Sequence, residues 1–239
     1  MLKDLQKFYR KNGILSTHFT CRWKKECKSG NRKFTGPKSS FVPSGYEKGR
    51  LPRLLFLSLD SGSAEKDPNK RTPAAVRRQE ETKAPSVESF PTNRHWYRTH
   101  ELARYILRQF RPKLDIEDAK KYFAHVNSAK CCLNNPGRKE ASKRLFDNCR
   151  PYLLDEFKIL KPKIVVSQGY QAKRAIETMI DRVVRRRDEF SQVVSLNERE
   201  AFWLHTHHPA SYGPFNKQRA KGAAWERYSK RIYEWGKGI

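Results

Sequence analysis

The sequence predicts a three-layer α/β/α fold with a central, mainly parallel four-stranded sheet. Four short apolar runs are spaced along the chain, and segments with helical periodicity separate them. Strands that alternate with helices form parallel sheets that are covered by helices on both faces. Polar residues follow the apolar runs, which places candidate site residues at one edge of such a sheet.

The four apolar runs are the predicted strands. Short continuous apolar runs that end in turn residues are typical of strands buried on both faces. The first run is RLLFLSLDSGS, residues 53–63, which ends in an Asp-Ser-Gly turn. The others are YFAHVNSAKCC at 122–132, PKIVVSQG at 162–169 and AFWLHTHHPAS at 201–211.

Helices are predicted between and after these strands. In one of them, Leu102, Ile106 and Phe110 recur at the spacing of one helix face. The predicted segments are residues 97–110, 138–160, 170–182 and 217–235, with a further short amphipathic helix at residues 2–11.

The chain divides into an N-terminal extension, residues 1–50, and a main domain, residues 51–239. The extension carries a helix and then an irregular, cysteine-bearing stretch rich in Gly, Pro, Ser and Lys. Residues 64–92 are polar and rich in Lys, Arg, Glu and Pro, which predicts an exposed or mobile insertion in the main domain.

The charge indicates a polyanionic partner. The chain has 51 Lys and Arg residues against 25 Asp and Glu residues, a net charge of +26. Basic residues occur along the whole chain, including 182–187 and 217–221, so a basic tail alone does not explain the excess. DNA or RNA is the commonest partner of such a protein, and a merely solubilising basic surface is the alternative.

Hydropathy argues against a membrane protein. No apolar stretch approaches the ~18 residues that span a bilayer. The first residues, MLKDLQKFYRKNG, lack the apolar core of a signal peptide. We therefore expect an intracellular protein without membrane contact. We further predict a monomer in the cytoplasm of a prokaryotic cell.

Polar residues follow the four apolar runs and are the first candidate site residues. They are Asp60, Asn127, Gln168 and His208. The carboxyl ends of parallel strands meet at one edge of a sheet, where ligands bind. The first, second and fourth of these residues are therefore expected to converge.

Each of the three residues suits a step in chemistry on a nucleic-acid base. Asp60 can activate a water molecule or stabilise developing positive charge. His208 can donate a hydrogen bond to an anionic leaving group, and Asn127 offers the donor and acceptor that match a base edge. Taken singly, each also fits an ordinary turn, cap or surface role, so the hypothesis depends on all three together.

The cysteines are candidate metal ligands. Disulfides are rare inside cells, so the five cysteines are either ligands or free thiols. Cys21, Cys27, Cys131 and Cys149 could bind an iron–sulfur cluster or zinc, and Cys132 is either spare or replaces Cys131. The His-x-Glu and Pro-Cys-x-x-Cys signature of zinc deaminases is absent from the sequence.

Two segments combine aromatic and basic residues, HWYRTH at 95–100 and SYGPFNKQR at 211–219. Aromatic and proline side chains can wedge into a duplex, and basic ones contact phosphates. The predicted DNA contacts are Ser211, Tyr212, Pro214, Phe215, Lys217 and Arg219. The alternative is that these aromatic side chains complete the core.

The ordered set of motifs resembles the uracil-DNA glycosylase superfamily, most closely its iron–sulfur branch (family 4-like). The resemblance covers about residues 15–235, with the insertion at 64–92 outside it. LLFLSLDSG is similar to the family's first motif, HVNSAKC to its Asn-Val-Val-Lys-Cys strand end, and LKPKIVVSQG to its third strand. CRPYL is similar to the last cluster cysteine with its helix, and HHPAS to the His-Pro-Ser motif.

The resemblance implies a monofunctional glycosylase that flips a base out of DNA and leaves an abasic site without a covalent intermediate. Asp60 would activate water, Asn127 would recognise the base, and His208 would stabilise the departing base. Trp96, or alternatively Tyr97, would stack on the flipped base. The four cysteines would hold a [4Fe-4S] cluster.

The chain also departs from the family pattern. Leu59 and Gly62 replace the residues that close off the C5 side of a pyrimidine in uracil-specific enzymes. An open C5 side predicts a larger substrate, such as a hypermodified, glucosylated hydroxymethylcytosine of phage DNA, and a role in antiviral defence. The alternatives are an ordinary uracil repair glycosylase and a non-catalytic nucleic-acid-binding protein.

The cysteine spacing is the second departure. The Cys-x5-Cys spacing of the first pair and the longer gap from Cys131 to Cys149 differ from the usual pattern. A structural zinc ion, or no metal, is therefore the alternative to a cluster.

Overall fold

The computed structural model describes residues 1–28, 34–61, 65–83, 94–132, 139–209 and 223–238. Its centre is a six-stranded sheet in the order β4-β3-β5-β8-β7-β6. The four predicted strands are present and run parallel to one another. They are β3 (Leu54–Asp60), β4 (Phe123–Ala129), β5 (Ile164–Gln168) and β8 (Arg199–Thr206).

Two further strands extend the sheet beyond the predicted four. β7 (Ser191–Leu196) pairs antiparallel with β8, and β6 (Ile180–Arg186) forms the edge. The predicted helix at 170–182 is shorter, because α8 (Tyr170–Glu177) ends before β6 begins. The strand β6 exposes nearly all of its residues, so its sequence, IDRVVRR, lacks the apolar pattern that marks a buried strand.

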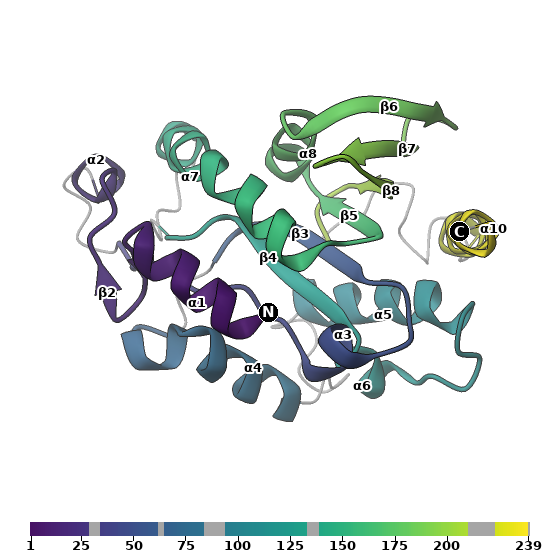
Figure 1. Ribbon diagram of the computed structural model, residues 1–239, viewed down its shortest axis with the longest axis horizontal. Coiled ribbons are helices and arrows are strands. Elements are labelled where there is room, and N and C mark those ends of the chain that lie inside the picture. The colour runs from purple at the N-terminus through teal and green to yellow at the C-terminus, as the bar shows by residue number, and fades with distance from the viewer. Residues whose placement is uncertain (29–33, 62–64, 84–93, 133–138, 210–222, 239) are drawn as a thin grey trace.

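Helices cover both faces of the sheet, as Figure 1 shows. Leu55 and Leu57 of β3 pack with α1 (Leu2–Lys11), α7 (Lys139–Leu160) and α8. Leu54 and Phe56 point to the other face and pack with α5 (Arg94–Arg108), α6 (Ile116–Ala119) and α10 (Ala223–Lys237). Successive residues of a strand face opposite sides, so an apolar run supplies both cores. The three-layer α/β/α prediction is confirmed.

The N-terminal extension packs on the first of these cores through Leu5 and Tyr9 of α1, which are buried. It continues through β1 (Ile14–Leu15), β2 (His18–Phe19), α2 (Lys24–Lys28) and α3 (Ser44–Lys48). No described helix is long and apolar enough to cross a bilayer.

The described part of the insertion predicted at 64–92, residues 65–83, is folded and packs on the surface of the domain. This part forms the 3-10 helix η1 (Pro68–Arg71) and α4 (Pro73–Thr82). Arg71 is 2% exposed, and its guanidinium donates to the carbonyl oxygens of Pro37, Glu65 and Gly36 at 3.1, 2.6 and 2.7 Å. A buried charge is tolerated when every donor finds an acceptor, which composition alone does not reveal. Residues 84–92 lie outside the described residues.

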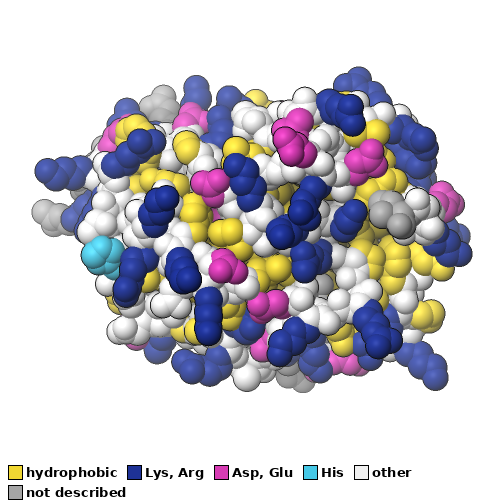
Figure 2. Space-filling view, in the orientation of Figure 1, with side chains coloured by type: hydrophobic (Ala, Val, Ile, Leu, Met, Phe, Trp, Pro, Cys, Tyr) yellow, Lys and Arg dark blue, Asp and Glu magenta, His cyan; other side chains and the backbone are white. Residues whose placement is uncertain are grey.

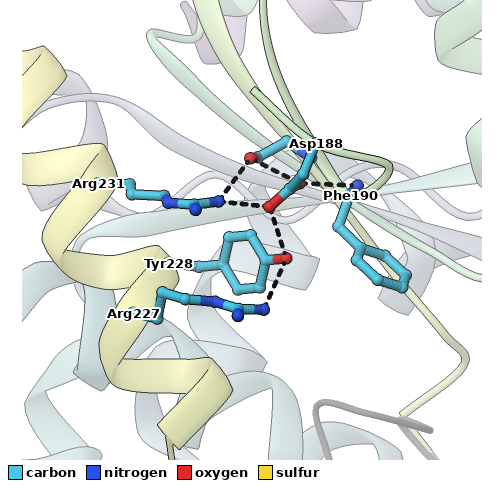
Figure 3. Close-up of polar contacts among 6 residues, drawn as sticks. Asp188, Phe190, Arg227, Tyr228 and Arg231 are labelled. Atoms are coloured by element: carbon cyan, nitrogen blue, oxygen red, sulfur yellow. Dashed lines mark hydrogen bonds and ion pairs between the residues drawn. The ribbon is translucent and has the colours of Figure 1, made fainter. Parts of the chain in front are cut away.

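A polar cluster attaches the turn between β6 and β7 to α10 (Figure 3). The Asp188 carboxylate accepts hydrogen bonds from Arg231, from Tyr228 at 3.0 Å and from the Phe190 amide at 2.9 Å. Burial opposes ionisation of Asp188, but these bonds and one from Ser191 outweigh it and lower its pKa to about 2. The cluster therefore holds the added hairpin against the helix that covers this face.

A buried ion pair joins four segments of the chain. The Lys130 ammonium, just after β4, contacts the Glu156 carboxylate of α7, and both side chains are almost fully buried. Glu156 also accepts hydrogen bonds from Tyr9 of α1 and from Ser40, the latter at 2.9 Å. The pair thus holds α1 and the segment around Ser40 against β4 and α7.

We predict that Lys130→Ala lowers the free energy of unfolding by about 3–5 kcal/mol, because it leaves the Glu156 charge buried without its partner. Urea denaturation measures the change. Lys158→Ala is the matched control, since Lys158 forms an exposed pair with Asp155 at 3.5 Å. It should change stability by less than about 1 kcal/mol. Equal effects of the two substitutions would contradict the structural role of the buried pair.

Candidate active site

The structure brings Asp60, Asn127 and His208 together around one cavity of about 340 Å³ at the carboxyl end of the parallel strands. Trp96 also lines this cavity. The three residues come from β3, β4 and the segment after β8. Gln168, which follows the third apolar run, is fully buried.

Asp60 is the last residue of β3 and lies opposite Ala129 of β4. Its Oδ2 accepts a hydrogen bond from the Cys132 thiol at 3.2 Å. The next residue, Ser61, accepts a hydrogen bond from the buried Arg71 at 3.0 Å. The carboxylate is therefore held by the strand, by a neighbouring thiol and by a loop that the described part of the insertion anchors.

Asn127 lies inside β4, opposite Ser58 of β3, rather than after the strand. Its side chain is 7% exposed and lines the cavity. No side-chain hydrogen bond to Asn127 occurs within the described part of the chain. Its amide can therefore offer a donor and an acceptor to a ligand in the cavity.

Gly169, which follows β5, takes a backbone conformation that favours glycine and lies beside the loop that carries His208. Its φ is +91° and its ψ is 169°. A Cβ atom here would lie 3.4 Å from Leu59 Cδ2 and 3.7 Å from His208 Cβ. Leu59 and His208 thus both lie beside Gly169, and both line the cavity.

Trp96, near the start of α5, packs edge-on against other rings in the cavity wall. Its ring centroid lies 6.0 Å from that of Phe41 and 5.3 Å from that of His125. Its indole Nε1 is buried and has no hydrogen-bond partner in the part of the chain that the structure describes. Tyr97, the predicted alternative, is not among the described residues that line the cavity. Of the two predicted stacking residues, Trp96 is therefore the one that lines the cavity.

Two histidines that line the cavity, His95 and His125, were not assigned from the sequence. The His95 ring lies 5.4 Å from that of His208 and 5.9 Å from that of His125. Burial lowers the pKa of His95 to about 4, and it lowers that of His125 well below its usual value. Both imidazoles are therefore neutral at pH 7. The segments HWYRTH and YFAHVNSAKCC contain them, but no spacing rule separates them from surface histidines.

A buried polar network lies beneath these histidines. His125 Nε2 lies 2.8 Å from the Ser58 hydroxyl, which donates to Gln168 Oε1 at 2.6 Å. Gln168 in turn donates from Nε2 to Thr99 at 3.2 Å, and Thr99 donates to the His95 carbonyl at 2.8 Å. The network connects β3, β4, β5 and α5, so it orients His125 and the start of α5 together.

Four of the five cysteines meet at one end of the molecule. Cys27, Cys131 and Cys149 are buried in one apolar cluster with Leu145 and Phe146. Cys21 lies near these three residues, because a negative charge on its sulfur raises the pKa of each of their thiols. The fifth cysteine, Cys132, points instead to Asp60. These are the four positions predicted as ligands.

The donor chemistry fits a cluster ligated by four thiolates. No group of three His, Cys, Asp or Glu side chains in the described ranges lies close enough to hold a single metal ion. A four-iron cluster binds each thiolate through a different iron atom, so its ligands stand further apart than those of one ion. Donors already approach two of the sulfurs: the Lys130 amide lies 3.4 Å from Cys149 Sγ, and Asn148 Nδ2 lies 3.4 Å from Cys27 Sγ.

Several predicted contacts lie outside the described residues. They are Gly62 of the first motif and the predicted DNA-binding residues Ser211, Tyr212, Pro214, Phe215, Lys217 and Arg219. Their roles stay predictions.

A family model, the uracil DNA glycosylase superfamily, matches residues 83–228. The match spans more than half of the chain and includes Trp96, Asn127 and His208. Asp60 and the first two cysteines precede it. A search of curated proteins finds no match to this chain.

We predict that the protein loses stability as the pH falls from about 7 to about 4. Burial lowers the pKa of His95 and of His100 to about 4. The unfolded chain takes up these protons near the usual pKa of about 6.5, so it binds more protons than the folded protein in this window. Each histidine then contributes up to about 1.4 kcal/mol per pH unit.

Urea denaturation at pH 7.5, 6 and 5 measures this dependence. His95→Gln should flatten the slope, and His18→Gln should not, because His18 is exposed. A slope unchanged by His95→Gln would contradict a neutral, buried His95.

Proposed function

Since the chain belongs to the uracil DNA glycosylase superfamily, we propose that it excises a modified pyrimidine base from DNA. Members of this superfamily are in general DNA glycosylases, which bind DNA and hydrolyse N-glycosidic bonds. The observation that carries the proposal is the meeting of Asp60, Asn127 and His208 around one cavity. A protein that only binds DNA does not need these three groups together.

Binding begins with the charge. The net charge of +26 attracts the phosphate backbone, and releasing counterions from DNA favours the complex. Figure 2 shows Lys and Arg side chains scattered across the whole visible face rather than gathered in one stripe. Such a distribution supports sequence-independent contact with DNA. The target base would then be flipped into the cavity, at a cost of a few kcal/mol of unstacking.

In the cavity, Trp96 would stack on the flipped base and Asn127 would hydrogen-bond to its edge. The rings of Phe41 and His125 hold the indole in place. The Asn127 amide sits on a central part of β4, which fixes its position better than a loop would. The two residues thus orient the glycosidic bond relative to Asp60.

Asp60 would stabilise the oxocarbenium-like sugar and orient the attacking water. Its carboxylate keeps one oxygen in contact with the Cys132 thiol, which leaves the other for water. A carboxylate that is already in place near the developing positive charge lowers the activation barrier, because no protein group has to reorient as the bond breaks. No covalent intermediate is needed, and the product is an abasic site.

His208 would stabilise the base as it leaves with a negative charge. The neighbouring His95 is neutral at pH 7, because burial lowers its pKa to about 4. An uncharged, poorly solvated wall strengthens a hydrogen bond from His208 to an anion.

For the substrate we propose a cytosine with a bulky C5 substituent, such as the glucosylated hydroxymethylcytosine of phage DNA, rather than uracil. Leu59, an apolar residue, lines the cavity. The family resemblance implies that it stands in place of the residue that closes off the C5 side in uracil-specific enzymes. A cavity of about 340 Å³ has room for more than a pyrimidine ring. Removing such bases from invading DNA would serve antiviral defence.

We further propose that Cys21, Cys27, Cys131 and Cys149 hold a [4Fe-4S] cluster. The cluster would clamp the N-terminal extension to the segment just after β4, which carries Cys131, and to α7, which carries Cys149. Metal binding of this kind contributes directly to folding stability. The cluster has no part in the proposed hydrolysis.

We predict that Asp60→Asn lowers the rate of base release by about 10²- to 10⁴-fold and leaves DNA affinity within about twofold. Asparagine keeps the shape of the side chain and removes its negative charge. Release is measured by strand cleavage at abasic sites in oligonucleotides that contain uracil, hydroxymethylcytosine or glucosylated hydroxymethylcytosine. Asp155→Asn, on the exposed side of α7, is the matched control.

Wild-type rates in Asp60→Asn would refute the role of Asp60. Efficient release of uracil, with none of the bulky bases, would refute the substrate and leave an ordinary repair glycosylase.

A second prediction concerns the metal. Protein purified without oxygen should be brown, with a broad visible absorption band and iron and sulfide in equal amounts. The Cys149→Ser variant should lose the absorption band together with the iron and sulfide. The Cys132→Ser variant should keep them, because Cys132 points to Asp60. A colourless protein that contains zinc, or one that contains no metal, would overturn the cluster.

A further inference from the structure

We propose that the cavity contains a second compartment, a subsite built by Lys38, Ser39 and Glu80 that binds the hydroxyl groups of a sugar attached to the base. This inference rests on the proposed function and deepens it. It assigns the recognition of the substituent to residues of the N-terminal extension and of α4, whereas the proposed chemistry uses the ends of the strands.

The position of these residues follows from the backbone. The chain around Phe41 runs antiparallel to β4, the edge strand, and Phe41 exchanges two backbone hydrogen bonds with His125, each of 2.9 Å. The Lys38 amide donates to the Lys130 carbonyl at 2.9 Å, further along the same edge. Lys38 and Ser39 therefore lie beside the part of β4 that carries Asn127, the residue proposed to hold the base.

Ser39 supplies the first sign of a missing ligand. It is 3% exposed, it lines the cavity, and its hydroxyl is buried with no hydrogen-bond partner among the described residues. The hydroxyl of the next residue, Ser40, donates to Glu156 at 2.9 Å. Buried polar groups are normally paired, so an unpaired hydroxyl in a cavity wall indicates a partner that binds there.

Lys38 and Glu80 supply a donor and an acceptor beside it. Their ammonium and carboxylate lie 3.3 Å apart, with side chains 25% and 15% exposed, and both line the cavity. The ion pair holds each side chain in one orientation before a ligand arrives, which lowers the entropic cost of binding. A sugar hydroxyl both donates and accepts, so it can bridge such a pair.

The wall here combines one carboxylate, Glu80, with two ammonium groups, Lys38 and Lys83. The carboxylate is the group that separates a neutral sugar from a phosphate of the DNA backbone. Glu80 would repel a phosphate, whereas it accepts hydrogen bonds from hydroxyl groups. Val76 and Phe41, both buried, also line the cavity. Their apolar surfaces match the C–H face of a sugar ring.

The test measures binding in the Asp60→Asn background, where the base stays on the DNA. Two oligonucleotides of the same sequence carry one hydroxymethylcytosine, either glucosylated or bare. The subsite predicts that the glucosylated DNA binds at least about tenfold more tightly. Ser39→Ala should reduce this preference about 2- to 10-fold, and Glu80→Gln about tenfold or more, as expected for losing a neutral and a charged hydrogen bond.

Glu117→Gln is the control for Glu80→Gln, because it makes the same change at an exposed position of α6. It should leave the preference unchanged.

Two outcomes would overturn the subsite. One is equal affinity for the two DNAs. The other is a loss of affinity in Ser39→Ala and Glu80→Gln that is the same for both DNAs, which would indicate a phosphate contact. The proposed function would fail in a different way. The wild-type protein would then release neither base, although the binding preference and its loss in the variants would still be seen. That result would refute base excision and leave the subsite standing.

Discussion

The buried ion pair between Lys130 and Glu156 is the contact on which the other parts of the molecule depend. Lys130 follows β4, three residues after Asn127 and one before Cys131. Its partner Glu156 also binds Tyr9 and Ser40, so the same carboxylate holds α1 and the segment that lines the cavity. A charge without water is tolerated only when its partners are in place. The pair therefore couples the assembly of the cavity wall to that of the cysteine cluster.

The cavity is completed by segments that lie outside the sheet. The strands β3 and β4 contribute Asp60 and Asn127, but the wall beyond β4 comes from the N-terminal extension and from α4. Arg71 joins these parts, since it binds the carbonyl oxygens of Gly36 and Pro37 as well as the Ser61 hydroxyl. We thus propose that the strands carry the residues that cleave the glycosidic bond, and that the N-terminal extension and α4 carry those that recognise the C5 substituent of the base. A change in substrate could then arise in α4 without disturbing the strand ends.

Neutral polar groups form one side of the cavity in which the base is proposed to leave. His125 is held by Ser58, which leads through Gln168 to Thr99. Burial keeps the imidazoles of His95 and His125 uncharged at pH 7, because it lowers their pKa values. A wall of oriented, uncharged dipoles suits a reaction that separates charge, since it need not reorganise as the bond breaks. The same burial makes the fold sensitive to acid.

The sequence by itself determined the layered fold, the four parallel strands and the residues placed around the cavity, namely Asp60, Asn127, His208 and Trp96. It could do so because buried strands are continuous apolar runs and because parallel topology brings their ends to one edge. Only the tertiary structure decided the rest. The strand β6 is exposed and has no apolar pattern, and Arg71 is buried because distant carbonyl oxygens satisfy it. The roles of His95 and Ser39 likewise depend on which side chains surround them, and burial by distant segments leaves no local signal in a sequence.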